Sequence, residues 1–239
     1  MTTASTPKNA ATVILLRPGA SGGFEVFLTR RPDRMDVLGG AYVFPGGTLT
    51  KDDWSERSLK RCRGLSRRQA QKLLGAHLKP DIALGYWVAA VRELFEEVGV
   101  LLAATEPDRP LALQDRRQKE ALLQKRGGLI AGRLAFHEVL ESEDIYIDVK
   151  RLAYFSHWQT PEKISARFDT RFFLAPLPSD QVPLETSEEV AHGLWLPPER
   201  ALQLYAQRKL PMIFPTYASL RTLADFDSVE AVVREYQGR

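Results

Sequence analysis

One helical segment, from about Ile82 to Val98, constrains the fold of this chain more than any other part of its sequence. It ends at Gly99, the residue type expected just after a helix C-terminus. On a helix that turns about 100° per residue, Glu93, Glu96 and Glu97 fall within an arc of roughly 100°. The opposite side is apolar and consists of Trp87, Val88, Val91, Leu94, Phe95 and Val98. One face therefore anchors the helix in a core, and the other presents carboxylates.

The glutamate cluster has two explanations. A solvated acidic face is the general expectation for an amphipathic helix. However, Glu96 and Glu97 lie in the last turn, where the helix macrodipole disfavours negative charge by roughly 0.3–1 kcal/mol each, and Glu93 and Glu97 form a like-charged i,i+4 pair. A divalent cation would reverse both unfavourable terms, because Mg²⁺ prefers clustered oxygen ligands. Arg92 lies one turn from Glu96, where it can pair with a carboxylate and fix its orientation.

Changes in hydrophobic period predict an α/β domain with a mixed sheet between helices. Apolar runs at Ala11–Arg17 and Phe24–Arg31 flank a turn-forming segment and predict a hairpin. Ala41–Phe44 predicts a third strand that ends at Pro45-Gly46-Gly47. Further strands are expected at 152–157, 170–175 and 190–196. Further helices are expected after the capping-box pattern that starts at Ser66, within 110–143, and at 198–208 and 228–236.

Composition excludes several classes of protein. The chain has 239 residues, 44% of them hydrophobic and 26% charged, which is typical of a globular protein. Its longest aliphatic run, Val13–Leu16, is far shorter than the ~18 apolar residues of a membrane span. A net charge of +3 gives no reason to expect a nucleic-acid or membrane partner. The single cysteine, Cys62, and the absence of a legible signal peptide favour a cytoplasmic protein.

The segment Arg92-Glu93-Leu94-Phe95-Glu96-Glu97-Val98-Gly99-Val100 resembles the second half of the Nudix box, and Phe44-Pro45-Gly46-Gly47 resembles its start. Asp53 stands where the box has a glutamate. About 31 residues are inserted between Asp53 and Arg92, because the box itself places only seven residues between these two positions. The resemblance implies a Nudix-type α/β/α sandwich over residues 1–239. We expect its core at about 10–205, a helical insertion at about 54–80 and a C-terminal helical extension at about 206–239.

Membership of this superfamily implies a diphosphate hydrolase that depends on Mg²⁺ or Mn²⁺. Glu96 and Glu97 are then the principal metal ligands, and Glu93 is a further ligand or the general base. Gly46 and Gly47 allow the loop backbone to approach the metal and contribute a carbonyl. Many members take another glutamate from a later loop, and Glu188 and Glu189 occupy that position. The identity of the base stays open, and a solvated loop is the alternative for the Glu188–Glu189 segment.

Residues upstream of the box resemble the motif of coenzyme A-cleaving Nudix enzymes. The chain reads Phe27-Leu28-Thr29-Arg30-Arg31-Pro32, followed in register by Gly40 and the Phe44–Gly47 segment, and departs from the motif at Phe27, Pro32 and Asp36. Arg30 and Arg31 are therefore candidate substrate-binding residues. The long insertion and the stretches Trp158–Pro161 and Arg167–Phe173 resemble the coenzyme A diphosphatases of animal peroxisomes. The sequence ends in Gly238-Arg239 and not Ser-Lys-Leu, so no peroxisomal address is expected.

The expected substrate is a small-molecule diphosphate, CoA or acyl-CoA, cleaved to adenosine 3′,5′-bisphosphate and (acyl-)phosphopantetheine. ADP-ribose, a nucleotide sugar or a nucleoside triphosphate is the alternative, since the same catalytic residues would serve. A non-catalytic Nudix-fold binding module is disfavoured by the intact glutamates and Arg92. A homodimer is left open.

The inserted segment 54–80 is strongly basic, with a balance of 8 − 1 = +7. A solvated pair of basic helices is the simpler interpretation. CoA differs from most Nudix substrates by its 3′-phosphate, however, and Arg67, Arg68 and Lys72 lie within one turn of a predicted helix. They are therefore candidate ligands for that phosphate. The four histidines show no metal-binding spacing.

Overall fold

A computed structural model describes residues 6–20, 22–35, 37–106, 109–113 and 116–237. Two sheets organise the chain. The main sheet contains β1 (Lys8–Pro18), β2 (Phe24–Arg30), β3 (Tyr42–Val43), β4 (Gly46–Thr48), β9 (Ala153–Gln159), β10 (Phe168–Pro176) and β11 (His192–Leu196). The smaller sheet contains β5 (Cys62–Arg63), β6 (Ala103–Glu106), β7 (Arg109–Pro110) and β8 (Tyr146–Asp148).

The helices are α1 (Glu56–Lys60), α2 (Arg67–Leu74), α3 (Pro80–Val98), α4 (Arg116–Ile130), α5 (Phe136–Ser142), α6 (Pro198–Ala206), α7 (Phe214–Leu223) and α8 (Val229–Gln237). Two 3₁₀ turns, η1 (Lys51–Trp54) and η2 (Val149–Arg151), complete the described elements. None of the helices in the described ranges combines the length and hydrophobicity needed to span a membrane.

The main sheet is mixed, as predicted. Its strand order is β11-β2-β1-β10-β9, with β3 paired to β2 and β4 paired to β1. β1 runs parallel to β10, and its pairings with β2 and β4 are antiparallel. The predicted hairpin is therefore present.

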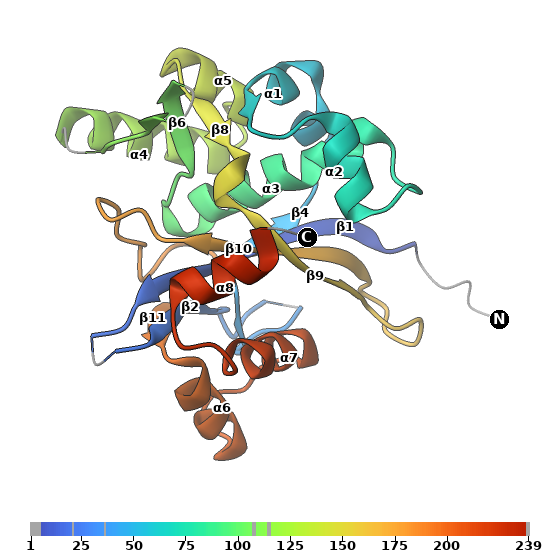
Figure 1. The fold of residues 1–239 in the computed structure, drawn as a ribbon, viewed down its shortest axis with the longest axis vertical. Coiled ribbons are helices and arrows are strands. Elements are labelled where there is room, and N and C mark those ends of the chain that lie inside the picture. The colour runs from blue at the N-terminus through green and yellow to red at the C-terminus, as the bar shows by residue number, and fades with distance from the viewer. Residues whose placement is uncertain (1–5, 21, 36, 107–108, 114–115, 238–239) are drawn as a thin grey trace.

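Helices cover both faces of the main sheet (Figure 1), and β1 shows why. Side chains of a strand alternate between its two faces. Ala11, Val13 and Leu15 pack into the core beneath α3, whereas Ile14 and Leu16 pack into the core shared with α6, α7 and α8. Both faces are apolar, so β1 is an almost continuous hydrophobic run.

Three features differ from the sequence-based expectations. Gly46 and Gly47, expected in a loop after the third strand, pair with Thr12 and Ala11 as part of β4. α7 lies within the expected C-terminal helical extension, but its bounds were not predicted, because its buried face includes Thr216 and Ser219, which hide the apolar period. The small sheet escaped prediction because its strands of two to four residues are too short to show a period of two.

Candidate active site

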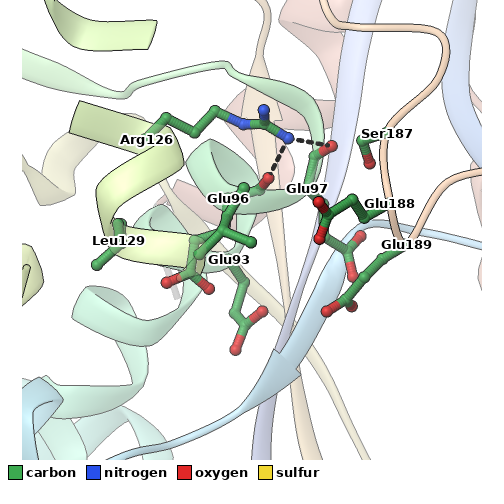
Figure 2. A pocket seen from close by; sticks show the side chains of 9 residues that line it. Glu93, Glu96, Glu97, Arg126, Leu129, Ser187, Glu188 and Glu189 are labelled. Carbon is green, nitrogen blue, oxygen red and sulfur yellow. Dashed lines mark hydrogen bonds between the residues drawn. The ribbon is translucent and has the colours of Figure 1, made fainter. Parts of the chain in front are cut away.

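α3 places Glu93 and Glu97 against β4 of the main sheet. Pro80 occupies its first turn, and Gly99 ends it in the left-handed conformation with φ 72°. Val91, Leu94, Phe95 and Val98 are buried in the core, which fixes the rotation of the helix about its axis. Glu93, Glu96 and Glu97 therefore line the same pocket (Figure 2).

Arg92 joins the two halves of the box. Its Nε and Nη2 donate to both carboxylate oxygens of Asp53, at 2.8 and 3.0 Å. Its Nη1 donates to Glu93 Oε1 and to Glu96 Oε2, each at 2.8 Å, so the predicted pairing with Glu96 is present. Nη2 also donates to the carbonyl oxygen of Thr48 at 2.9 Å. One buried guanidinium thus orients three carboxylates.

Asp53 orients Arg92 and does not line the pocket. Its side chain is fully buried in η1, where it also accepts a hydrogen bond from the backbone N–H of Thr50 at 2.7 Å. The shorter acid reaches Arg92 because η1 brings it directly against α3. Its role is therefore to hold the guanidinium between the sheet and the glutamates.

Burial and mutual repulsion oppose ionisation of the glutamates. Burial raises the pKa of Glu97 well above its ordinary value, and the carboxylates of Glu93 and Glu189 raise it further, whereas Arg31 and the Gly46 N–H lower it. Burial likewise raises the pKa of Glu93 to about 7, against the opposing effect of Arg92. The pKa of Glu96 is also raised by burial. Such a site favours either protons or a cation.

The two glycines lie where a side chain has no room. A Cβ at Gly47 would lie 2.5 Å from the carboxyl group of Glu93, and one at Gly46 would lie 2.3 Å from the carbonyl oxygen of Ala11. The backbone N–H of Gly46 donates to Glu97 Oε2 at 3.3 Å. β4 therefore brings backbone amide groups directly beneath the carboxylates.

Glu188 and Glu189 reach the same pocket from the loop before β11. Nine residues line it, namely Glu93, Glu96, Glu97, Arg126, Leu129, Ile130, Ser187, Glu188 and Glu189. In the view of Figure 2, α4 lies to the left of the helix glutamates and Glu188 and Glu189 lie to the right. The loop glutamates thus add to the carboxylate cluster that the box residues begin.

Sequence analysis missed Arg126, the basic residue among those lining the pocket. From α4 its Nε donates to the carbonyl oxygen of Phe95 at 2.9 Å, and its Nη2 donates to those of Glu96 and Glu97 at 2.5 and 3.3 Å. α3 has no basic residue in its own last turn, so this cation offsets both the helix dipole and the two glutamates there. Nothing in the local sequence signals the contact, because about thirty positions separate the partners.

The candidate substrate-binding residues fall into two groups. Arg31 lies near enough to Glu97 to affect its pKa, and Arg30 pairs with Asp33 at 2.6 Å. Arg67, by contrast, pairs with Glu56 and Asp81, and Asp81 lies in the first turn of α3. Residues 81 to 93 of a helix span about 18 Å at ~1.5 Å per residue.

Arg68 and Lys72 are exposed on the same helix as Arg67, and none of the three lines the pocket. The structure therefore does not bring these insertion residues to the carboxylates. The pairing of Arg67 with Asp81 places the basic helix α2 near the opposite end of α3, which favours the interpretation as a solvated basic helix. Binding of the CoA 3′-phosphate by these three residues stays a prediction.

The donor set fits a hard divalent cation. Carboxylate oxygens from α3 and the Glu188–Glu189 loop share one pocket, which suits Mg²⁺ or Mn²⁺. Within the described ranges, no three His, Cys, Asp or Glu side chains already have the arrangement of a metal site. Glu93 and Glu96 are instead bonded to Arg92, which neutralises part of their charge. Each of the two carboxylates uses one oxygen for this bond, Glu93 Oε1 and Glu96 Oε2.

Comparison with known proteins extends these observations. The family model described as the NUDT19 Nudix domain matches residues 61–223. The chain is 25% identical over 232 residues to the acyl-coenzyme A diphosphatase NUDT19 of Xenopus laevis, covering 85% of this chain and 60% of that protein. It is 26% identical over 257 residues to the human protein of the same name, covering 93% of this chain and 66% of that protein. The chain thus spans about two thirds or less of either relative.

A solved structure shows the same fold. The crystal structure of a Nudix hydrolase from Alicyclobacillus acidocaldarius superposes with a TM-score of 0.75, at 24% identity and with 96% of each chain covered. The predicted α/β architecture with a mixed sheet between helical layers is thereby confirmed.

Proposed function

Since this chain belongs to the NUDT19 Nudix domain family, whose model matches residues 61–223, we propose that it is a divalent-metal-dependent diphosphate hydrolase acting on CoA or acyl-CoA. The products would be adenosine 3′,5′-bisphosphate and (acyl-)phosphopantetheine. The observation that carries the proposal is the pocket in which Arg92 orients Glu93 and Glu96 beside Glu97, Glu188 and Glu189. The names of the NUDT19 relatives support the choice of substrate.

The proposed chemistry assigns a task to each group. Glu96 and Glu97 would hold Mg²⁺ or Mn²⁺, with a carbonyl of Gly46 or Gly47 as a further ligand. Glu93 would serve either as another ligand or as the general base. The cation, when bound, would neutralise diphosphate charge and lower the pKa of an attacking water. Arg92 keeps Glu93 and Glu96 turned toward the pocket, and Arg126 balances their charge from the end of α3.

The general base is proposed from the same carboxylates. A base works best when its pKa lies near the working pH. Glu93 is one candidate, because its carboxylate lines the pocket beside Glu96 and Glu97 and burial raises its pKa to about 7 in the metal-free protein. Glu189 is the alternative, because its charge acts on both Glu96 and Glu97.

A substrate panel tests the proposal. The purified protein would be incubated with CoA, acetyl-CoA, ADP-ribose, a nucleotide sugar and a nucleoside triphosphate, each with Mg²⁺, with Mn²⁺ and with chelator. Chromatography would identify the products. We expect metal-dependent release of adenosine 3′,5′-bisphosphate from CoA, and none from the Glu97→Gln variant. Faster turnover of ADP-ribose or of the triphosphate would favour the alternative substrates, and metal-independent cleavage would refute the site.

Two further proposals concern the whole protein. We propose a cytoplasmic location, which cell fractionation tests. A homodimer is the oligomeric state to be examined by sedimentation.

A further inference from the structure

The pocket has an apolar wall as well as an acidic one. Among its nine lining residues, Leu129 and Ile130 carry aliphatic side chains, and both come from the last turn of α4. Leu129 is 8% exposed, whereas Ile130 is 37% exposed. Figure 2 shows Leu129 beside the glutamates of α3, on the side away from Glu188 and Glu189. Carboxylates and aliphatic carbon thus face the same small space.

This wall is fixed relative to the carboxylates. Leu129 and Ile130 follow Arg126 by three and four residues, so all three side chains lie on one face of α4. Arg126 binds that face to the carbonyl oxygens of Phe95, Glu96 and Glu97. The same hydrogen bonds that cap α3 therefore set the position of the aliphatic side chains.

An aliphatic wall at this place would discriminate among diphosphates by the group that directly adjoins the diphosphate. In ADP-ribose and nucleotide sugars that group is a hydroxyl-bearing sugar, and in a nucleoside triphosphate it is a third phosphate. In CoA the pantetheine half begins with a CH₂ and a quaternary carbon that carries two methyl groups. Polar hydroxyls lose hydrogen bonds with water against aliphatic carbon, whereas methyl groups gain by burial there.

We propose that Leu129 and Ile130 form a subsite for the dimethyl-substituted carbon next to the diphosphate of CoA. This inference rests on the proposed function and adds the part of the substrate that α4 recognises. It also gives a physical reason for a CoA diphosphatase to place an aliphatic wall beside its catalytic carboxylates.

The most direct test removes the methyl groups from the substrate. Wild-type kcat/KM would be measured for CoA and for a CoA analogue in which both methyl groups are replaced by hydrogen. We expect CoA to be preferred about tenfold, the effect of burying about two methyl groups. Equal kcat/KM for the two substrates overturns the subsite while leaving the proposed function standing. Absence of any cleavage of either substrate overturns both.

Two variants test whether the preference for CoA over the analogue comes from the pocket wall. Ile130→Asn is expected to fold normally because the side chain is partly exposed, and to reduce the preference to less than about threefold. Leu123→Asn is the matched control, since Leu123 lies on the same helix, is 46% exposed and does not line the pocket. It should keep the wild-type preference. An undiminished preference in Ile130→Asn, or an equal loss in Leu123→Asn, contradicts the assignment.

Discussion

Asp53 and Arg92 form a buried two-pronged ion pair although 39 positions separate them in the sequence. The intervening chain leaves at η1, forms α1, β5 and α2, and returns at the start of α3. The insertion therefore interrupts the box in sequence but not in space. The pair, together with the bond from Arg92 to the carbonyl oxygen of Thr48, holds the guanidinium beside Glu93 and Glu96.

Loss of the Asp53 charge should destabilise the protein. Asp53→Asn leaves half of the Arg92 fork without an ionised partner in a buried place, and breaking such a pair costs about 3–5 kcal/mol. Since Glu93 and Glu96 still accept hydrogen bonds from Arg92, we expect the free energy of unfolding to fall by about 3 kcal/mol. Urea unfolding of the metal-free protein measures this loss. Glu162→Gln, a change at an exposed carboxylate, should unfold at the wild-type urea concentration, and an unchanged midpoint for Asp53→Asn would disprove the role.

Glu97→Gln should abolish most activity without unfolding the protein. The substitution removes a charged ligand at the point where transition-state charge is stabilised, so kcat should fall at least ~100-fold. Initial rates with saturating Mn²⁺ measure it, and circular dichroism checks the fold. Retained activity in a correctly folded variant would exclude Glu97 as a metal ligand.

The same substitution should change how stability depends on pH. The pKa of Glu97 in the folded, metal-free protein lies well above its ordinary value of 4.5. The folded state therefore holds a proton that the unfolded chain has already released, and stability decreases as pH rises above 4.5 toward the folded pKa. The stability of the metal-free Glu97→Gln variant should decline less than that of the wild type between pH 5 and pH 8. At pH 8 the variant should be at least as stable as the wild type. A lower melting temperature than wild type at pH 8, without metal, would show instead that Glu97 makes a stabilising bond.

Particular residues show how far the sequence could lead. Sequence alone could locate the glutamates and Arg92, because they recur at helical spacing on one helix. It could also locate the glycine pair, which lies in one short segment. Arg126 could not be found, because its contact with α3 depends on how α4 packs and leaves no local pattern. The position of the basic insertion along α3 could not be predicted for a related reason. Both ends of the insertion must lie near α3, but α3 is a long helix, and only packing decides which end α2 covers.

Glu188 and Glu189 should differ in importance. Glu189 acts electrostatically on Glu96 and Glu97, whereas the charge of Glu188 acts on Arg126. We expect Glu189→Gln to lower kcat at least ~10-fold and Glu188→Gln to lower it less than about threefold. Single variants, the double variant and their pH–rate profiles measure this. Near wild-type kcat in the double variant would rule out a catalytic loop carboxylate.

Arg126 should matter for both stability and rate. Arg126→Met removes a cation and hydrogen bonds from the end of α3, and we expect a loss of about 1–2 kcal/mol together with a lower kcat. Arg126→Lys keeps the charge but not the planar fork, so it should recover part of each loss. Arg133→Met, at an exposed position just beyond α4, is the control. If Arg126→Met has the same free energy of unfolding as this control and keeps the wild-type kcat, Arg126 does not cap α3.

The basic insertion should not contribute to substrate binding in the pocket. Arg67 is paired with Glu56 and Asp81, and Asp81 lies about 18 Å along α3 from Glu93 at ~1.5 Å per residue. Replacing Arg67, Arg68 and Lys72 together with Gln should therefore leave kcat/KM within about twofold of the wild-type value, both for CoA and for 3′-dephospho-CoA. Arg31→Gln is the contrasting variant, because Arg31 lies close enough to Glu97 to affect its pKa, and it should lower kcat/KM at least ~10-fold. A tenfold loss in the triple variant, specific to CoA and with an unchanged melting temperature, would show that α2 contacts the 3′-phosphate after all.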